Sequence, residues 1–437
     1  MNKWQNLYKK LNTLNLVKVY GQIDKVTGLV IESTGPKAAV GEICLLEAEL
    51  KKEPILAEVV GFKDRKLLLM PLGEMTGVAP GTRVTSTGET LKVNVSKKLL
   101  GRVIDGLGKP MDGLGEIEVY DSYPIMNKPP HPLKRQRIKE PLSLGIKAID
   151  GLLSCGKGQR LGIFAGSGVG KSTLMGMIAR NTAADINVIG LIGERGREVR
   201  EFLEKDLKEE GLSRSVIVVS TSDQPALTRL KAAFVATTIA EYFRDQGQDV
   251  LLMMDSITRF AMAQREVGLA IGEPPTTRGY TPSVFALLPR LLERAGAGEK
   301  GSITGLYTVL VEGDDLNEPV SDTVRGILDG HIALSRSLAS RGHYPAIDIL
   351  SSVSRSMPDI TSSSHQAYAT KLRKVLANYN DAEDLINIGA YQSGSNKDID
   401  YALEKIEPIR EFLTQPVTER LDWDTTVSQL ETLFVKE

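Results

Sequence analysis

Residues 166–173 bring together three glycines, a lysine and adjacent hydroxyl side chains, a combination suited to binding a phosphate chain. Glycines allow consecutive backbone N–H groups to turn toward one point, where a larger side chain would block the phosphates. Lys171 can reach the β- and γ-phosphates of a nucleotide, and the Ser172 hydroxyl can bind Mg²⁺. The segment therefore predicts a phosphate-binding loop made of Gly166, Ser167, Gly168, Val169, Gly170, Lys171, Ser172 and Thr173.

The sequence around this loop has the order that such a loop requires. An apolar run at 161–164 predicts a buried strand before it, and an apolar segment opened by Lys171 predicts a helix after it. The N-terminus of that helix adds a partial positive charge beside the phosphates. Ala165 stands where the usual pattern begins with glycine. Because alanine is small and lies next to the strand, we interpret this change as harmless.

Three further charged side chains could complete a hydrolytic site. Asp255 ends the apolar run 250–254, where a Mg²⁺-organising carboxylate belongs, although a helix cap would also fit there. Glu194 follows the apolar run 187–192 and could polarise a water molecule, although a solvated charge cluster is at least as compatible with the pattern. Arg355 follows a short Ser-rich turn and could act as an arginine finger on a phosphate.

The elements that must position these side chains alternate between strand and helix, which is typical of a doubly wound α/β sheet. We predict strands at 161–164, 187–192, 216–220, 250–254, 303–311 and 331–334, and a strong helix at 226–245. Strand patterns end after residue 361, and helices are predicted at 367–376, 382–388, 398–413 and 425–434. A small helical domain should therefore end the chain.

The segment 19–95 has short apolar runs separated by Gly, Pro and Asp, which predicts a small β-barrel. Phe62 is the only aromatic residue between residues 21 and 119. Barrels that bind oligonucleotides stack bases on aromatic side chains, so we favour a structural barrel. The Gly- and Pro-rich stretch 101–113 indicates a hairpin-like connector. The expected domains are 1–18, an N-terminal amphipathic helix; 19–95, the barrel; 96–360, the ATPase domain; and 361–437, the helical domain.

Composition excludes several other classes of protein. The 437 residues carry a net charge of −1, which argues against a protein that mainly coats nucleic acid. The two cysteines are far apart in the sequence, which argues against a disulfide and favours a reduced cytosolic protein. The four histidines lack metal-ligand spacing. We find no signal peptide and no apolar run of ~20 residues. Residues 1–16 predict a basic amphipathic helix that either packs on its own domain or docks a partner.

Taken in order, these motifs resemble the catalytic-subunit family of the rotary ATPases and its protein-export branch. The resemblance rests on AGSGVGKST, GERGRE, LLMMDSITRFA, GEPPTTRGYTPSVF, DDLNEPVSD and YPAIDILSSVSR, and it covers roughly residues 21–413. The GEPPTTRGYTPSVF segment resembles the type III secretion ATPases, and the whole chain is most similar to the flagellar branch. The resemblance implies a P-loop NTPase (RecA-like) core, an N-terminal β-barrel and a C-terminal helical domain.

The same resemblance assigns roles to particular residues, with ATP and Mg²⁺ as substrate and cofactor. The loop from Gly166 to Thr173 would hold the phosphates, and Ser172 and Asp255 would organise Mg²⁺. Glu194 would activate water with support from Arg197 and Glu198, and Arg259 would lie near the γ-phosphate. Tyr344 would pack against adenine, for which core packing is the alternative. Arg355 would reach into a neighbour's site, which implies a homohexamer.

Partners and location are likewise implied by the resemblance. They are a peripheral-stator regulator, a coiled-coil stalk protein, membrane proteins of an export gate, and flagellar substrate–chaperone complexes, with no nucleic acid. The protein would be cytoplasmic and peripherally associated with the inner membrane. The alternatives are a virulence-type III secretion ATPase, an RNA-translocating ring ATPase, and a catalytically silent scaffold subunit. The neutral charge and aromatic-poor barrel oppose the RNA translocase, and Glu194 and Arg355 oppose the scaffold.

Overall fold

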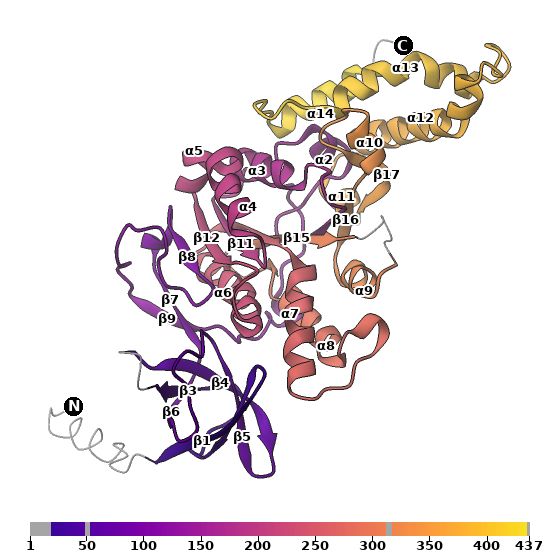
Figure 1. Ribbon diagram of the computed structural model, residues 1–437. Helices are drawn as coiled ribbons and strands as arrows, with labels where there is room; N and C mark the ends of the chain where they lie inside the picture. The colour runs from indigo at the N-terminus through magenta and orange to yellow at the C-terminus, as the bar shows by residue number, and fades with distance from the viewer. Residues whose placement is uncertain (1–18, 49–52, 312–316, 435–437) are drawn as a thin grey trace. The chain divides into compact units, whose positions relative to one another are not determined.

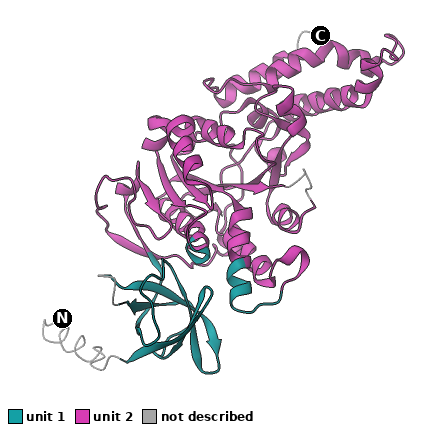
Figure 2. Cartoon of the chain, in the orientation of Figure 1, with its two compact units in different colours: residues 1–92, 225–228, 266–274 teal, residues 93–224, 229–265, 275–437 magenta. Residues whose placement is uncertain are grey.

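The computed structural model describes residues 19–48, 53–311 and 317–434 (Figure 1). The predicted N-terminal helix at 1–16 and part of the DDLNEPVSD motif lie outside these residues. The described chain forms two compact units (Figure 2). The first contains residues up to Lys92 together with Pro225–Thr228 and Glu266–Pro274, and the second contains the rest, including the C-terminal helices. We describe each unit by itself.

Within the first unit, six strands close into a barrel in the order β1-β2-β5-β4-β3-β6. Neighbouring strands are antiparallel, and alternate apolar side chains such as Ile31, Leu46 and Leu69 fill the interior without solvent exposure. This is the barrel that the short apolar runs predict. The strands are β1 (Tyr20–Thr27), β2 (Val30–Thr34), β3 (Glu42–Glu47), β4 (Ile55–Lys63), β5 (Lys66–Pro71) and β6 (Arg83–Thr90).

A nine-stranded sheet forms the centre of the second unit, in the order β17-β16-β10-β15-β13-β11-β12-β8 with β14 paired to β15. The strands from β16 to β8 run parallel, and their apolar runs are buried on both faces. The strands are β8 (Val103–Asp105), β10 (Arg160–Ala165), β11 (Ile186–Ile192), β12 (Ser215–Ser220), β13 (Asp249–Asp255), β14 (Gly296–Ala297), β15 (Ser302–Leu310), β16 (Gly330–Leu334) and β17 (Ile347–Ser354).

Two edge strands of this sheet correct the sequence-based prediction. Val103–Asp105 pairs with β12 as β8, whereas the sequence suggested only a connector around it. Ile347–Ser354 is the strand β17, antiparallel to β16, whereas we expected a Ser-rich turn before Arg355. Ile347 and Ile349 are buried and alternate with more exposed residues, as expected of a strand. After an irregularity in the pairing with β16, Ser352 and Ser354 continue the buried face.

Helices pack on the faces of the sheet (Figure 1). Those beside the core are α2 (Lys147–Leu152), α3 (Lys171–Asn181), α4 (Gly196–Glu201), the π-helical turn η3 (Phe202–Leu207), α5 (Lys208–Ser213), α6 (Ala226–Asp245), α7 (Ile257–Ala270), α8 (Pro282–Leu292), α9 (Pro319–Ile327), α10 (Arg336–Ser340) and α11 (Met357–Ile360). The minor elements are β7 (Lys92–Val95), which pairs with β9 (Asp121–Pro124), and the 3₁₀ turns η1 (Lys97–Leu99), η2 (Pro132–Lys134) and η4 (Thr277–Gly279).

The chain ends in α12 (Ser363–Asn387), α13 (Lys397–Leu413) and α14 (Trp423–Thr432). Helices α12 and α13 lie side by side (Figure 1), and α2 packs against α13 and α14. The two helices predicted at 367–376 and 382–388 are one continuous helix, because Tyr379 and Ala382 continue its buried face through the polar interval. None of the helices in the described part of the chain is long and apolar enough to cross a bilayer.

A buried ion pair joins α6 to Arg294, two residues after the end of α8. Arg294 and Glu241 are each 1% exposed, and their side chains meet in two contacts of 2.8 and 2.6 Å. The Arg294 guanidinium also donates to the Ile125 carbonyl and the Thr238 hydroxyl. Each guanidinium nitrogen of Arg294 and each carboxylate oxygen of Glu241 therefore makes a hydrogen bond. Buried charges need such partners because they have lost their contacts with water.

Replacing Arg294 with methionine should destabilise the second unit by about 3–5 kcal/mol, because the Glu241 carboxylate would remain buried without its partner. The free energy of unfolding in urea measures the loss. The control is Lys374→Met, which breaks an exposed ion pair between α12 and α13 and should give no resolvable change. Equal losses of stability from the two substitutions would contradict the claim that the buried Arg294–Glu241 pair matters more than the exposed pair.

Candidate active site

The predicted phosphate-binding loop lies between the end of β10 at Ala165 and the start of α3 at Lys171. Gly168 and Gly170 have φ values of +78° and +87°, a region that side chains disfavour. A Cβ on Gly170 would also come within 3.4 Å of the Tyr344 ring. Ser167, Gly168 and Ser172 are exposed, so the loop presents its backbone and the Ser172 hydroxyl to solvent. The geometry suits a bound phosphate chain.

Lys171 and Asp255 meet at the carboxyl edge of the sheet. The Lys171 ammonium contacts the Asp255 carboxylate, and both side chains are largely buried. The same carboxylate oxygen accepts a hydrogen bond of 2.6 Å from the Thr308 hydroxyl on β15. The sequence analysis missed Thr308, because a threonine within a buried strand carries no motif. Thr308 fixes the orientation of the carboxylate from the neighbouring strand.

Glu194 lies beside this pair, because β11 and β13 are neighbours and Leu191 is in register with Asp255. The Glu194 Oε1 atom is buried and has no hydrogen-bond partner among the described residues. Burial, followed by the negative charge of Asp255, raises the pKa of Glu194 to about 7, and the positive charge of Lys171 opposes that rise. A carboxyl group with such a pKa can accept a proton near neutral pH.

Arg259 is packed against the turn that leads to Glu194. A Cβ on Gly193 would lie 2.9 Å from the Arg259 Cβ, and Gly193 has a φ of +72°, so the position requires glycine on two grounds. The Arg259 Nε atom is buried without a hydrogen-bond partner among the described residues. The structure therefore places Arg259 beside the turn that leads to Glu194 and leaves one of its donors available, and its role near the γ-phosphate stays a prediction.

The structure does not bring Arg197 to this site. Its side chain is 86% exposed and contacts Glu201 one turn further along, at 3.3 Å. Glu198 lies near Glu194, and its charge contributes to the raised pKa of Glu194. Of the two residues expected to support Glu194, only Glu198 therefore lies beside it within one subunit. The role of Arg197 stays a prediction.

Tyr344 lies next to the end of the phosphate-binding loop and is 46% exposed, so part of its ring is open to solvent. Its carbonyl accepts a hydrogen bond of 2.9 Å from the backbone N–H of Gln415. The Gln415 side chain, which is buried, accepts from the Lys147 N–H and donates to the carbonyls of Gly145 and Glu419. The sequence analysis missed Gln415, since an isolated glutamine between two helices carries no signal.

Arg355 lies at the opposite edge of the sheet from its own phosphate-binding loop. Because β17 is antiparallel to β16, Ser354 is in register with Gly330, and the Arg355 N–H donates to the Asp329 carbonyl at 3.0 Å. Asp329 in turn bonds Arg160, the first residue of β10. The loop follows the last residue of β10, about 16 Å further at ~3.3 Å per residue. One subunit therefore does not bring Arg355 to its own loop.

The oxygen donors at the site fit Mg²⁺ bound together with a nucleotide. Among the described residues, no cluster of three or more His, Cys, Asp or Glu side chains could hold a metal alone. Mg²⁺ usually takes one or two protein ligands and completes its shell with phosphate and water. The exposed Ser172 hydroxyl and the Asp255 carboxylate supply ligands of that kind. Ser172 lies in the phosphate-binding loop after β10, and Asp255 ends β13, the second strand along from β10 in the sheet.

Three family models match consecutive parts of the chain. The ATP synthase alpha/beta family matches at 23–88 with its beta-barrel domain and at 145–354 with its nucleotide-binding domain. The T3SS EscN ATPase C-terminal domain matches at 361–432. The matched ranges correspond to the barrel, the parallel sheet and the terminal helices. They confirm the predicted fold class.

Curated relatives share the whole length of the chain. It is 55% identical over 436 residues to the flagellum-specific ATP synthase of Bacillus subtilis, with 100% of both chains covered. It is 52% identical over 424 residues to the type 3 secretion system ATPase of Xanthomonas euvesicatoria, with 97% and 96% covered. Such relatives do not favour the RNA-translocase alternative.

Solved structures also match almost the whole length of the chain. The assembled ATPase EscN of the enteropathogenic E. coli type III secretion system matches with a TM-score of 0.89 and 48% identity. The match covers 94% of this chain and 99% of the EscN chain. A second structure, of assembled EscN in complex with its central stalk EscO, matches with a TM-score of 0.88.

Proposed function

This chain belongs to the family of flagellum-specific ATP synthases and type 3 secretion system ATPases, and we propose that it acts as a homohexameric ring that energises or assists the type III export of flagellar proteins. It is an ATP-hydrolysing enzyme of the ATP synthase alpha/beta family. The observation that carries the proposal is the placement of Glu194, with its raised pKa, beside Lys171 and Asp255.

The chain's own residues suggest how ATP is held. Backbone N–H groups of residues 166–170 and the N-terminus of α3 bind the phosphates, and Lys171 shifts from Asp255 to the β- and γ-oxygens. The open face of Tyr344 packs against adenine beside Gly170. Ser172, and Asp255 through water, would hold Mg²⁺, which would neutralise negative charge at the phosphate oxygens when bound.

Hydrolysis requires a water molecule aligned with the γ-phosphate. The Glu194 carboxylate accepts a proton from that water as its oxygen attacks phosphorus, and the bond to the ADP oxygen breaks. Arg259, packed against Gly193, holds positive charge near the developing phosphate. Arg355 of a neighbouring subunit bridges the phosphate oxygens from the other side, since it lies far from its own loop.

Assembly follows from this division of the site. Each subunit carries both a loop and a finger, so identical subunits in head-to-tail contact complete one another, and such contacts close into rings. We further propose that the terminal helices or the ring's central hole meet a coiled-coil stalk protein, as the solved complex of EscN with its central stalk EscO supports.

The remaining partners belong to the same proposal. Residues 1–16 are the candidate docking segment for a peripheral-stator regulator, and the ring delivers substrate–chaperone complexes to the membrane proteins of an export gate. The proposed location is the cytoplasm, at the inner-membrane export apparatus. The high identity to flagellum-specific enzymes favours flagellar over virulence-type export.

The test is the ATPase activity per subunit as a function of protein concentration, at saturating ATP and Mg²⁺. A site shared between subunits predicts a steep rise as rings form, followed by a plateau. If the activity per subunit does not change with concentration, measuring the particle size of the same samples shows whether they are all monomers or all rings. Constant activity from samples that remain monomeric would refute the shared site, and constant activity from preformed rings calls for dilution until they dissociate.

A further inference from the structure

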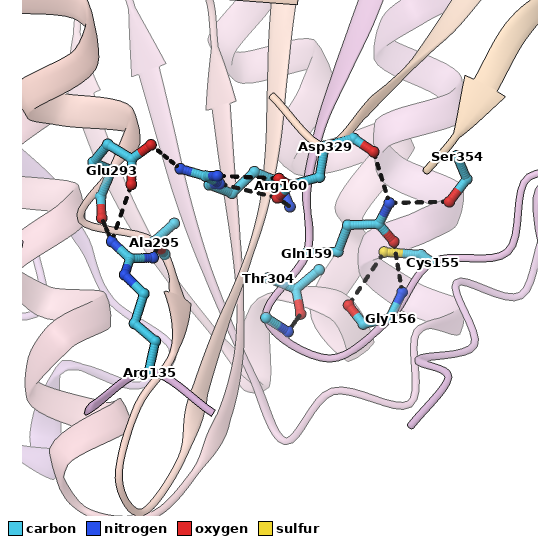
Figure 3. A network of polar contacts seen from close by, with 11 residues as sticks. Arg135, Cys155, Gly156, Gln159, Arg160, Glu293, Ala295, Thr304, Asp329 and Ser354 are labelled. Carbon is cyan, nitrogen blue, oxygen red and sulfur yellow. Dashed lines mark hydrogen bonds and ion pairs between the residues drawn. The ribbon is translucent and has the colours of Figure 1, made fainter. Parts of the chain in front are cut away.

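A network of polar side chains lies at the amino ends of β10 and β16, far from the phosphate-binding loop (Figure 3). It extends from Arg135 through Glu293, Arg160 and Asp329 to Gln159. From Gln159 it continues to Ser354, the residue before Arg355. We call this set the base network, and none of its side chains takes part in the chemistry described above.

The base network fixes the backbone on both sides of the peptide bond that leads to Arg355. The Arg355 N–H donates to the Asp329 carbonyl at 3.0 Å. The Ser354 hydroxyl accepts from the Gln159 amide at 3.0 Å and donates to the Ser154 carbonyl at 2.8 Å. The Gln159 amide also donates to the Asp329 carbonyl at 3.3 Å, so one side chain contacts both the end of β17 and the residue before β16 (Figure 3).

Gln159 is itself held in one orientation. It has no solvent exposure, and its Oε1 atom accepts from the Gly156 N–H at 2.8 Å, so the side-chain carbonyl and amide are both engaged. A buried amide with satisfied partners restricts the positions of the groups that it joins. Gln159 therefore sets the distance between the end of β17 and the turn before β16.

Asp329 is held just as firmly from the other side. Its carboxylate accepts from the Arg160 N–H, Nε and Nη2, each at 3.0 Å. Arg160 also contacts Glu293 at 2.6 Å. A two-pronged contact between a guanidinium and a carboxylate allows little rotation of either group. The Asp329 carbonyl that receives the Arg355 N–H is consequently at a fixed place.

The Arg355 side chain contrasts with its backbone. It is exposed, and within the described residues no hydrogen bond or ion pair engages its guanidinium. Other arginines differ from it: the half-buried Arg325 and the exposed Arg341 each pair with a carboxylate of the same chain. Arg355 thus has a backbone fixed by hydrogen bonds and a guanidinium without a partner among the described residues. This arrangement is expected of a side chain that contacts another molecule.

We propose that Gln159 is a positioning residue which, together with Asp329, fixes the Arg355 backbone so that its guanidinium reaches the ATP of the neighbouring subunit. This inference rests on the proposed role of Arg355 in trans. It predicts that a change at Gln159 impairs the finger of its own subunit and leaves that subunit's phosphate-binding loop competent.

The test uses the full-length ring and the substitution Gln159→Leu, which keeps the approximate volume and removes the amide. Its kcat should fall about tenfold with an unchanged KM for ATP, since misplacement of a catalytic group by a fraction of an ångström has effects of this order. Arg135→Met, at the far end of the base network, is the matched control. It loses contacts to Glu293 and Ala295 but none to Ser354 or Asp329, and should keep kcat.

Mixing subunits separates positioning from general damage. Lys171→Ala subunits lack a working loop but carry an intact finger, so an equimolar mixture with Gln159→Leu should reach about a quarter of wild-type activity. Without complementation, the mixture would give about one twentieth. A mixture of Gln159→Leu with Arg355→Ala should show no rescue. Ser354→Ala, which removes only the hydroxyl, repeats the test should Gln159→Leu not assemble.

Three outcomes would overturn the inference, and they have different meanings. An Arg355→Ala and Lys171→Ala mixture that fails to regain activity would refute the finger in trans, and the positioning role with it. Rescue in that mixture, without rescue of Gln159→Leu and Ser354→Ala, would leave the finger intact and refute positioning by Gln159 alone. If rings of Gln159→Leu were as active as wild-type rings, the positioning role of Gln159 would also be refuted.

Discussion

Replacing Glu194 with glutamine should lower kcat for ATP hydrolysis by about 10³-fold and leave the affinity for ATP nearly unchanged. Glutamine keeps the size of the side chain but cannot take a proton from the attacking water. The phosphates would still be held by the loop and Lys171, and neither makes a hydrogen bond to the buried Oε1 atom of Glu194. Steady-state turnover tests the fall in kcat, and fluorescent-nucleotide binding tests the unchanged affinity. Both are measured on the same preparation.

The control for this substitution is Glu204→Gln. Glu204 is an exposed carboxylate on η3 that pairs with Arg200 at 2.7 Å, so it has the same chemistry without the burial. Its loss should leave kcat within twofold, or about 0.4 kcal/mol of barrier. Comparable effects of the two substitutions would show that negative charge in this region, and not the Glu194 carboxylate, supports turnover.

The raised pKa of Glu194 adds a pH signature to the same prediction. The ionised carboxylate is the active form, so kcat/KM should fall as the pH drops through about 7, with a tenfold loss per unit below it. The ratio kcat/KM reports the free enzyme, which is the state whose burial and neighbouring charges raise the pKa. A flat profile between pH 6 and 8 would contradict the role of Glu194 as the proton acceptor.

Replacing Arg355 with alanine should abolish most turnover, with a loss of at least about 10³-fold, because a guanidinium that bridges the transferring phosphate is worth that much. The loss should appear in kcat with rings still assembled, since the Arg355 side chain has no partner among the described residues of its own chain. Activity and particle size measured together test this expectation.

Subunit mixing makes that prediction specific to a neighbour's site. Arg355→Ala and Lys171→Ala are each inactive alone, but in an equimolar ring half of the loops are intact and half of the neighbours carry a finger. Activity should return to about a quarter of wild type. A mixture that stays inactive would mean that Arg355 serves the loop of its own subunit, despite its place at the opposite edge of the sheet.

Local patterns in the sequence predicted the elements that carry the phosphate-binding loop. The buried apolar run before Gly166 and the helix after Lys171 depend on neighbours in the chain, and the structure has both as β10 and α3. Asp255 and Glu194 were also predictable as strand-end carboxylates. Parallel strands end at one edge, so their proximity follows from the alternation of strands and helices.

Contacts between distant segments were not predictable in this way. Thr308 acts on Asp255 across a strand pairing, and Gln415 reaches Tyr344 from 71 residues further along, so neither leaves a local pattern. The strand β17 was missed because its serines resemble a turn when read without its partner β16. The same omission hid the direction of Arg355, which only an antiparallel strand sends to the far edge of the sheet.

The segment around Gln415 adds hydrogen bonds between the end of the helix α13 and the residues around the phosphate-binding loop. Its backbone holds Tyr344, its side chain holds the residues before α2, and the carbonyls of Val417 and Glu419 accept from Arg180 and Asn181 at the end of α3. A partner bound to α12 and α13 and a nucleotide stacked on Tyr344, both as proposed above, would therefore act on the same segment. If such a partner changes the affinity for the nucleotide by some factor, the nucleotide must change the affinity for the partner by the same factor, because the two binding equilibria are linked.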